Sequence, residues 1–143
     1  MKYYISYKFS GEDKEKLKEI LSEISSIIES YNNETFVPYR DMQNWGEISM
    51  DSKGIITKSL AELKDVDAVL CLVFSSEKSE GMLLEAGYGK ALGKKIIIAK
   101  QKDARIIFLE DIADDLIEFN TQEDLKEKLY EYFNKKTHGK RKI

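Results

Sequence analysis

The sequence contains only one cysteine, one histidine and one proline among its 143 residues. The histidine, His138, lies near the C-terminus, and its isolation excludes Ser-His-Asp triads, Cys-His pairs and histidine-rich zinc sites. The cysteine, Cys71, lies in an apolar run, so we interpret it as a core residue with no disulfide or metal role. Any chemistry must therefore use carboxylates, tyrosines, hydroxyls, lysines or backbone amides.

Long apolar runs and an excess of positive charge are also missing. No run approaches the roughly 18 residues of a membrane-spanning helix, and the N-terminal segment does not have the pattern of a signal peptide. The formal net charge is −3, which gives no electrostatic reason to expect a nucleic-acid polymer as partner. We therefore expect a cytoplasmic protein that binds neither membranes nor nucleic acid.

The composition is that of one folded domain, with 42% apolar and 34% charged residues. We expect this domain to span residues 1–134, followed by a basic, solvated and frayed tail over residues 135–143.

Strand and helix patterns alternate along the chain. Aromatic, β-branched or continuously apolar segments predict strands at 2–9, 32–40, 67–74, 94–100 and either 104–111 or 115–120. Helical spacing predicts helices at 14–31, at 55–66, in the segment that follows Ser79, and at 121–133. The expected N-caps are Ser10 or Gly11 for the first helix and Thr121 for the last.

This alternation predicts an α/β fold, a doubly wound, flavodoxin- or Rossmann-like five-stranded parallel sheet with helices on both faces. In such sheets ligands bind outside the carboxyl ends of the strands, where the strand order reverses. Glu85 lies shortly after the third of these strand ends, so we expect its carboxylate near the ligand crevice.

Glu85 has no counter-charge at helical spacing. Gly81 and Gly89 lie four residues away, and Met82 and Tyr88 lie three residues away, where an ordinary surface glutamate has a lysine or arginine. One interpretation is a carboxylate whose partner is a substrate. The alternative is a plain packing helix in which Glu85 reaches solvent.

The start of the same helix has the composition of an anion site. Ser79 and Gly81 would present a hydroxyl and backbone amides to a phosphate, and the helix dipole would favour its negative charge. Gly87 and Gly89 would let the helix pack closely against the sheet. In the alternative interpretation Ser79 is only an N-cap.

The stretch from "DAVLCLVF" through "SEGMLLEAGYGKALGKKIIIA" resembles the signature of the nucleoside 2-deoxyribosyltransferase superfamily, and within it the 2′-deoxynucleoside 5′-monophosphate N-glycosidases. The positions that carry the resemblance are Asp67, Ser79, Gly81, Glu85, Gly87 and Gly93-Lys94. It implies N-glycosidic bond cleavage or transfer on a nucleoside or its 5′-monophosphate, without a cofactor, in a homodimer.

The resemblance also implies residue roles. Glu85 would be the nucleophile that attacks the anomeric carbon, a role that suits an oxocarbenium-like transition state. Ser79 and Gly81 would hold the 5′-phosphate, and Tyr4 would be a catalytic tyrosine, unless it is simply a core aromatic. Further phosphate contacts would come from the loop after the first strand, where the candidates are Ser6, Tyr7, Ser10 and Gly11.

The sequence departs from this pattern at Ser59, where the family has an aspartate that positions the sugar and protonates the leaving base. Glu62 and Asp65 fall on other faces of the predicted helix, and Asp51 lies two turns earlier. The segment "SYKFSG" likewise replaces a small-residue, glycine-containing turn. These departures favour a second hypothesis, a nucleotide-binding or interaction module without turnover.

A weaker resemblance links "YYISYKFSGED" and the following helix to TIR domains. Enzymatic TIR domains also use a glutamate after the third strand, to cleave the N-glycosidic bond of NAD. Glu85 would then act on a different substrate, or the domain would serve in signalling.

The loop after the second strand offers contacts to a nucleobase. Trp45 would stack on the base or pack over its own loop, and Asn44 would hydrogen-bond the base; Arg40 and Asp41 are weaker candidates. We interpret the lysines of "ALGKK" and "AKQKD" as solvated. We predict no metal, since no clustered carboxylates have ligand spacing.

Overall fold

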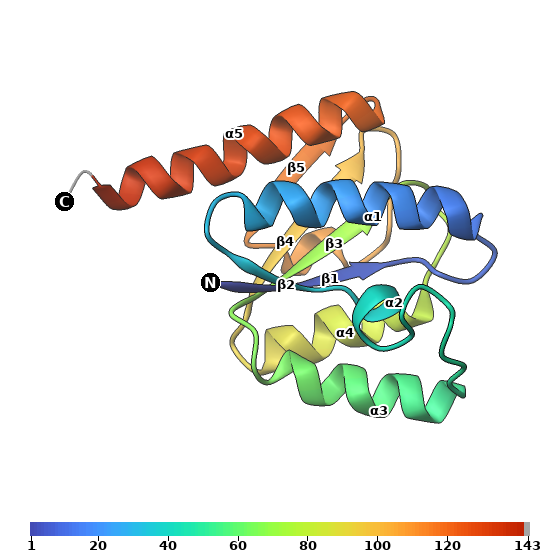
Figure 1. Ribbon diagram of the computed structural model, residues 1–143. Coiled ribbons are helices and arrows are strands. Elements are labelled where there is room, and N and C mark those ends of the chain that lie inside the picture. Colours follow the sequence, from blue (N-terminus) through green and yellow to red (C-terminus); the bar gives the residue numbers. More distant parts are fainter. Residues whose placement is uncertain (142–143) are drawn as a thin grey trace.

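The computed structural model describes residues 1–141 and confirms the predicted α/β fold (Figure 1). The strands are β1 (Lys2–Tyr7), β2 (Glu34–Phe36), β3 (Ala68–Val73), β4 (Lys95–Gln101) and β5 (Asp115–Phe119). The helices are α1 (Lys14–Glu29), α2 (Pro38–Asp41), α3 (Ser52–Leu63), α4 (Glu80–Ala91) and α5 (Gln122–Arg141), with a short 3₁₀ turn at Glu110–Ile112.

All five strands are parallel and lie in the order β2-β1-β3-β4-β5. The direction of winding reverses between β1 and β3, so the crevice at their carboxyl ends is where a ligand is expected in a doubly wound sheet. The third strand, β3, is buried along its whole length, as its continuous apolar run predicts.

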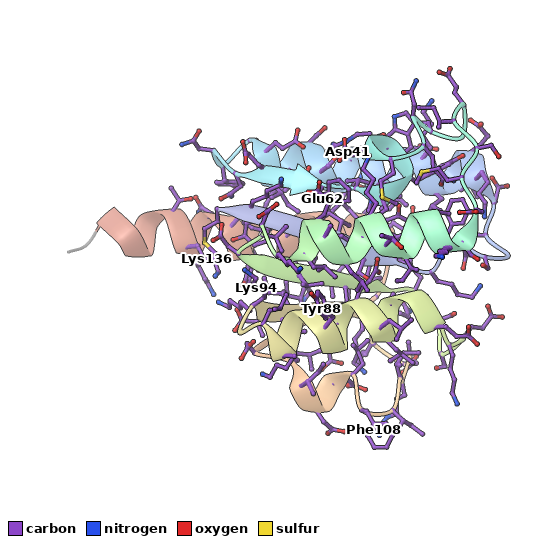
Figure 2. The ribbon with its side chains drawn as sticks, turned by 90° about the horizontal axis from the view of Figure 1, so that it is seen from below. Asp41, Glu62, Tyr88, Lys94, Phe108 and Lys136 are labelled. Atoms are coloured by element: carbon purple, nitrogen blue, oxygen red, sulfur yellow. The ribbon has the colours of Figure 1, made fainter. Side chains whose placement is uncertain are left out.

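Helices cover both faces of the sheet. Helices α1 and α5 lie together on one face, and α3 and α4 lie side by side on the other (Figures 1 and 2). Period-two alternation divides β1 between the two cores, because Tyr3, Ile5 and Tyr7 join the α1/α5 core while Tyr4 joins the α3/α4 core.

Several local predictions require correction. The N-cap of α1 is Asp13, not Ser10 or Gly11, since its carboxylate accepts hydrogen bonds from the backbone N–H groups of Glu15 and Lys16. Helix α3 begins at Ser52 because Asp51 caps it through the N–H of Gly54. Of the two segments that were predicted as alternatives for the fifth strand, 115–120 supplies β5 and 104–111 contains no strand.

Two other predictions on helix ends are tested by the structure. Thr121 caps α5 as predicted, accepting from the N–H of Asp124 at 3.1 Å. The helix continues to Arg141, past residue 134 where we expected the tail to begin. The side chains of residues 138–141, including His138, and all of residues 142–143 lie outside the described part. Within the described part, no helix combines the length and apolar character needed to cross a bilayer.

The α4 glycines differ from each other. A Cβ on Gly89 would lie 2.9 Å from Cγ2 of Val69 on β3, so this residue does permit close packing. A Cβ on Gly87 would meet no atom within 4 Å, and the prediction of a packing role for Gly87 was wrong.

Candidate functional site

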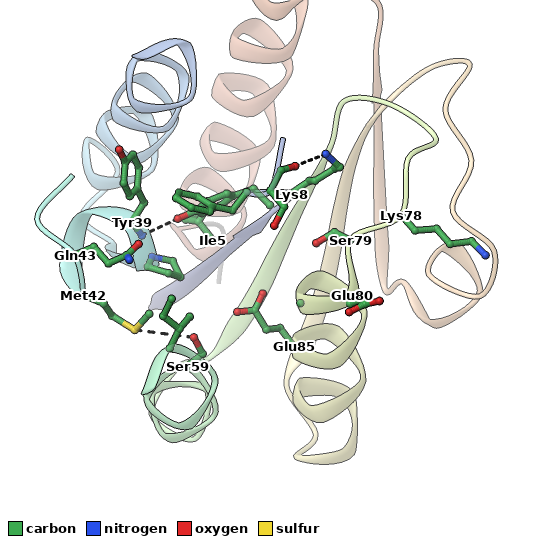
Figure 3. Close-up of a pocket in the computed structure, with 16 residues that line it drawn as sticks. Ile5, Lys8, Tyr39, Met42, Gln43, Ser59, Lys78, Ser79, Glu80 and Glu85 are labelled. Atoms are coloured by element: carbon green, nitrogen blue, oxygen red, sulfur yellow. Dashed lines mark hydrogen bonds between the residues drawn. The ribbon is translucent and has the colours of Figure 1, made fainter. Parts of the chain in front are cut away.

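A cavity of about 390 Å³ opens at the carboxyl end of β1, beside the point where the sheet reverses direction (Figure 3). It is bounded by β1, the loop after it, α2, α3 and the start of α4. Its lining residues are Ile5, Tyr7, Lys8, Phe9, Ser10, Pro38, Tyr39, Met42, Gln43, Ile55, Ser59, Lys78, Ser79, Glu80, Gly81 and Glu85. The position agrees with the crevice that the sheet topology predicts.

Glu85 lines this cavity. Its side chain projects from α4 toward β1, and the residue is only 8% exposed (Figure 3). Both carboxylate oxygens accept hydrogen bonds, one from the hydroxyl of Tyr4 and the other from the hydroxyl of Ser6 at 2.7 Å. The alternative in which Glu85 reaches solvent is therefore wrong.

Two opposing effects set the protonation of Glu85. Burial raises the pKa of the carboxyl above its ordinary value, and the hydrogen bonds from Tyr4 and Ser6 lower it in part. Among the described residues no lysine or arginine forms an ion pair with Glu85. Two hydroxyl donors therefore hold this carboxyl group, and no cation of the described residues pairs with it.

Tyr4 and Ser6 owe this arrangement to the period of β1. They lie two residues apart, so their side chains point to the same face, where α4 packs. Burial and the adjacent Glu85 carboxylate raise the pKa of Tyr4, which keeps its hydroxyl protonated as a donor. Ser6 was predicted to contact phosphate; the structure instead places its hydroxyl on Glu85.

The start of α4 forms one side of the cavity. Ser79 is the N-cap of α4, and its hydroxyl accepts a hydrogen bond of 3.2 Å from the backbone N–H of Met82. A Cβ on Gly81 would meet no atom within 4 Å, so the space beside this residue is open. Both line the cavity, as expected of an anion site at a helix N-terminus. Lys8 and Lys78 are also among the lining residues, although the Lys78 side chain extends outward, away from Glu85 (Figure 3), and sequence reasoning had not selected either of them.

Lys8 connects the loop after β1 with the loop after β3. Its ammonium group lies 3.3 Å from a carboxylate oxygen of Glu77 and 3.4 Å from one of Glu12. These pairs hold the cation at the edge of the cavity. Of the other candidates in the first loop, Ser10 lines the cavity, whereas Gly11 is exposed and does not.

Tyr7 serves the cavity indirectly. Its hydroxyl accepts a hydrogen bond of 2.7 Å from the backbone N–H of Tyr39, and this bond fixes the start of α2 against β1. Burial raises the pKa of Tyr7. Tyr7 also lines the cavity, although its side chain belongs to the core on the α1/α5 face of the sheet.

The structure does not bring Trp45 or Asn44 into the cavity. Trp45 packs edge-on against Tyr39 with ring centroids 5.5 Å apart, and the amide of Asn44 donates to Glu47 at 2.6 Å. Both residues have positive φ angles of 58° and 46°, which turn the loop away from the cavity. Trp45 therefore packs against α2 and the α1/α5 core, with the ammonium group of Lys18 5.6 Å from its ring, and not over the backbone of its own loop.

The side of the cavity opposite α4 is formed instead by α2 and α3. Its residues are Tyr39, Met42, Gln43, Ile55 and Ser59. Sequence reasoning missed the first four; the signal available was Pro38, which occupies the first position of α2 and so starts a helical turn directly after β2.

Ser59 lies on α3, faces the cavity and is 1% exposed. Its hydroxyl lies 4.0 Å from the sulfur of Met42 and approaches the Tyr4 hydroxyl. None of the three nearby acids replaces an aspartate here. Asp51 caps α3, Glu62 pairs with Lys2 at 3.6 Å, and Asp65 is exposed.

Two further residues for which sequence reasoning made a prediction are Lys100 and Cys71. Lys100 was predicted to be solvated, but it is 5% exposed, because residues 102–112 fold back over it and Glu110 lies 3.2 Å from its ammonium group. Cys71 is buried and unpaired, as predicted. Among the side chains that the structure describes, residues 1–137, no group of three or more His, Cys, Asp or Glu is arranged to hold a metal ion.

Comparison with known proteins tests the resemblance noted in the sequence. A sequence model described as nucleoside 2-deoxyribosyltransferase matches residues 7–135. The chain belongs to this family. The match includes Ser79, Gly81 and Glu85 and begins after Tyr4 and Ser6, and it favours this family over the TIR resemblance. No relative was found among curated protein sequences.

Three solved structures share the fold of this chain. The CMP N-glycosidase BcmB of Clostridium botulinum has a TM-score of 0.67 and 19% identity, covering 90% of this chain and 98% of its own. A 2-deoxyribosyltransferase of Bacillus psychrosaccharolyticus has a TM-score of 0.67 and 21% identity, covering 88% and 90%. One from Leishmania mexicana has a TM-score of 0.58 and 16% identity, covering 79% and 72%.

Proposed function

We propose that this protein cleaves or transfers the N-glycosidic bond of a nucleoside or nucleoside 5′-monophosphate, with Glu85 as the nucleophile. The observation that carries the proposal is the buried Glu85 carboxylate, held by two hydroxyl donors and facing the cavity without a cation. Membership of the nucleoside 2-deoxyribosyltransferase family supports it.

The geometry suits attack on an anomeric carbon. As the C1′–N bond breaks, positive charge develops on the sugar, and a nearby carboxylate both stabilises that charge and forms a glycosyl ester. The hydroxyl groups of Tyr4 and Ser6 orient the two oxygens of Glu85. Water, or the base of a second nucleoside, would then release the sugar and regenerate the carboxylate.

The contents of the cavity favour a 5′-monophosphate over a free nucleoside. Ser79 and Gly81 provide the start of α4, and Lys8 places an ammonium group at the edge of the cavity, paired with two glutamates. A phosphate bound there would leave the sugar beside Glu85 and the base between α2 and α3. One structural neighbour, the Clostridium botulinum enzyme, is named as acting on CMP.

The test is chromatography of free base after incubation with deoxynucleosides, deoxyribonucleoside and ribonucleoside 5′-monophosphates, and NAD. We expect base release from at least one monophosphate, and no release by Glu85→Gln, whose amide has nearly the same shape without the charge. Nicotinamide release from NAD alone would instead support the TIR-like activity.

A module without turnover remains the second candidate, and Ser59 in place of the family aspartate is the observation that favours it. Tight nucleotide binding by calorimetry, with no base released from any compound, would support the module and contradict the proposed activity. We also propose that the protein forms a cytoplasmic homodimer, and light scattering after size exclusion would test the dimer.

A further inference from the structure

The two sides of the cavity differ in chemistry, and Glu85 lies between them. The α4 side carries Lys8, Lys78 and Glu80, together with the amides at the start of α4. Every residue that α2, the turn after it and α3 contribute to the cavity is uncharged: Pro38, Tyr39, Met42, Gln43, Ile55 and Ser59. Figure 3 shows these two groups on opposite sides of the Glu85 carboxylate.

This division determines how the base can leave, provided that the proposed function holds. A phosphate on the charged α4 side directs the base to the uncharged side. When the C1′–N bond breaks, its electron pair moves to the ring nitrogen. A neutral base would then depart as an anion unless an acid protonates it, and such an acid contributes about 10²- to 10⁴-fold to rate.

The residues on the uncharged side are poor proton donors. Ser59 presents an alcohol, and Gln43 presents a carboxamide that makes no side-chain hydrogen bond within residues 1–141. The hydroxyl of Tyr39 lies beside Gly46. Tyr7 also reaches the cavity, but burial raises the pKa of its hydroxyl and makes it a weaker acid than an ordinary tyrosine.

The same residues suit a base that carries positive charge. The carboxamide oxygen of Gln43 accepts hydrogen bonds, and the sulfur of Met42 is a polarisable contact for a planar ring. No lysine among the described lining residues lies on this side. Lys8 is paired with two glutamates at the edge of the cavity, and the side chain of Lys78 extends away from Glu85 (Figure 3).

We propose that the preferred substrates are nucleoside 5′-monophosphates whose base is a cation at the glycosidic linkage, such as a pyridinium or an N7-alkylated purinium. Glu85 forms a C1′–O bond as the C1′–N bond breaks, and the electron pair neutralises the ring. The base leaves as a neutral molecule with no proton transferred to it. Water then adds to C1′, the ester electrons return to Glu85, and one proton passes to solvent.

The wild-type protein tests this with substrates matched in sugar and phosphate. GMP and 7-methyl-GMP differ by one methyl group and one charge, and nicotinamide mononucleotide is compared with CMP and UMP. We expect kcat/KM for the cationic members to exceed that for the neutral ones by about 10³-fold or more, the contribution of a missing general acid. Neutral bases released within tenfold of the cationic ones would overturn this inference and leave the proposed function intact. Release from no compound would contradict both.

A pair of variants provides an independent test. Ser59→Asp introduces an acid on the uncharged side, and Ser59→Asn has the same shape without the acid. We expect the ratio of kcat/KM for GMP to that for 7-methyl-GMP to be about 10²-fold higher in Ser59→Asp than in Ser59→Asn. Equal ratios in two folded variants would count against the inference.

The pH profile of the wild type covers the case in which these variants do not fold. With a cationic substrate, kcat/KM should rise as Glu85 ionises and then stay level at higher pH, because no acid must remain protonated. A fall at high pH between two ionisations, absent from substrate stability controls, would show that an acid takes part and would overturn the inference.

Discussion

The two faces of the sheet are built from the same strands but do different work. On the α1/α5 face, β1 contributes Tyr3, Ile5 and Tyr7 to a core that also contains Phe133 and Leu129. On the α3/α4 face, the same strand contributes Tyr4 and Ser6, and their hydroxyls bind a buried carboxylate. Burying a charge that is held only by neutral donors costs stability. The α1/α5 face therefore stabilises the fold. The α3/α4 face holds a reactive group at a cost in stability.

The largest stability effect should come from the α1/α5 face. Phe133 is 1% exposed and packs edge-on against Tyr3 with centroids 5.1 Å apart. Phe133→Ala should lower the free energy of unfolding by about 3–5 kcal/mol, because it removes a large ring from a closed core. Denaturant unfolding measures the loss, and kcat of the remaining folded protein should stay near wild type. A fall in kcat as large as that of an α3/α4-face variant would break the division between the faces.

Tyr4→Phe should do the opposite, affecting activity more than stability. The Tyr4 hydroxyl lowers the pKa of Glu85, so its removal should raise that pKa and move the rising limb of kcat/KM to higher pH. Loss of orientation should also reduce kcat/KM about 10- to 100-fold at neutral pH. A pH-rate profile of the variant checks both effects. An unchanged limb would show that Tyr4 is only a core aromatic.

The smallest expected effects on stability come from two glycines of α4, Gly89 and Gly87, which differ in how closely they pack. Gly89→Ala forces a methyl group against Val69 and should destabilise the protein by about 1–2 kcal/mol. Gly87→Ala, two residues away on open surface, should stabilise it by up to about 1 kcal/mol through higher helix propensity. Thermal unfolding of both variants distinguishes them. Equal shifts in the same direction would contradict the packing of α4 on β3 described here.

The sequence was sufficient for the fold because its signals were local. The continuous apolar run of β3 and the helical spacing of α1 do not depend on distant contacts. Glu85 was identifiable for a similar reason, since its missing counter-charge is visible at helical spacing. The pairing of Tyr4 and Ser6 on one face was also contained in the two-residue period of β1, although Ser6 was assigned to phosphate.

The remaining site residues depend on geometry that no local pattern carries. Trp45 lies outside the cavity because residues 44–46 adopt positive φ angles. For the tryptophan itself, nothing in "QNWGE" indicates such an angle. Lys100 is buried because a distant loop folds over it and brings Glu110 to it. Lys8 reaches Glu77 at the edge of the cavity only because β1 and β3 are neighbours in the sheet.

The measurement that tests the central claim most directly is the rate of base release by Glu85→Gln, on the substrate that the wild type cleaves best. Glu123→Gln, an exposed glutamate on α5, provides the matched control. We predict that Glu85→Gln loses at least about 10³-fold in kcat, as expected when a covalent nucleophile is removed, while Glu123→Gln keeps wild-type turnover. A Glu85→Gln protein that releases base within tenfold of wild type would contradict the role of Glu85 as nucleophile.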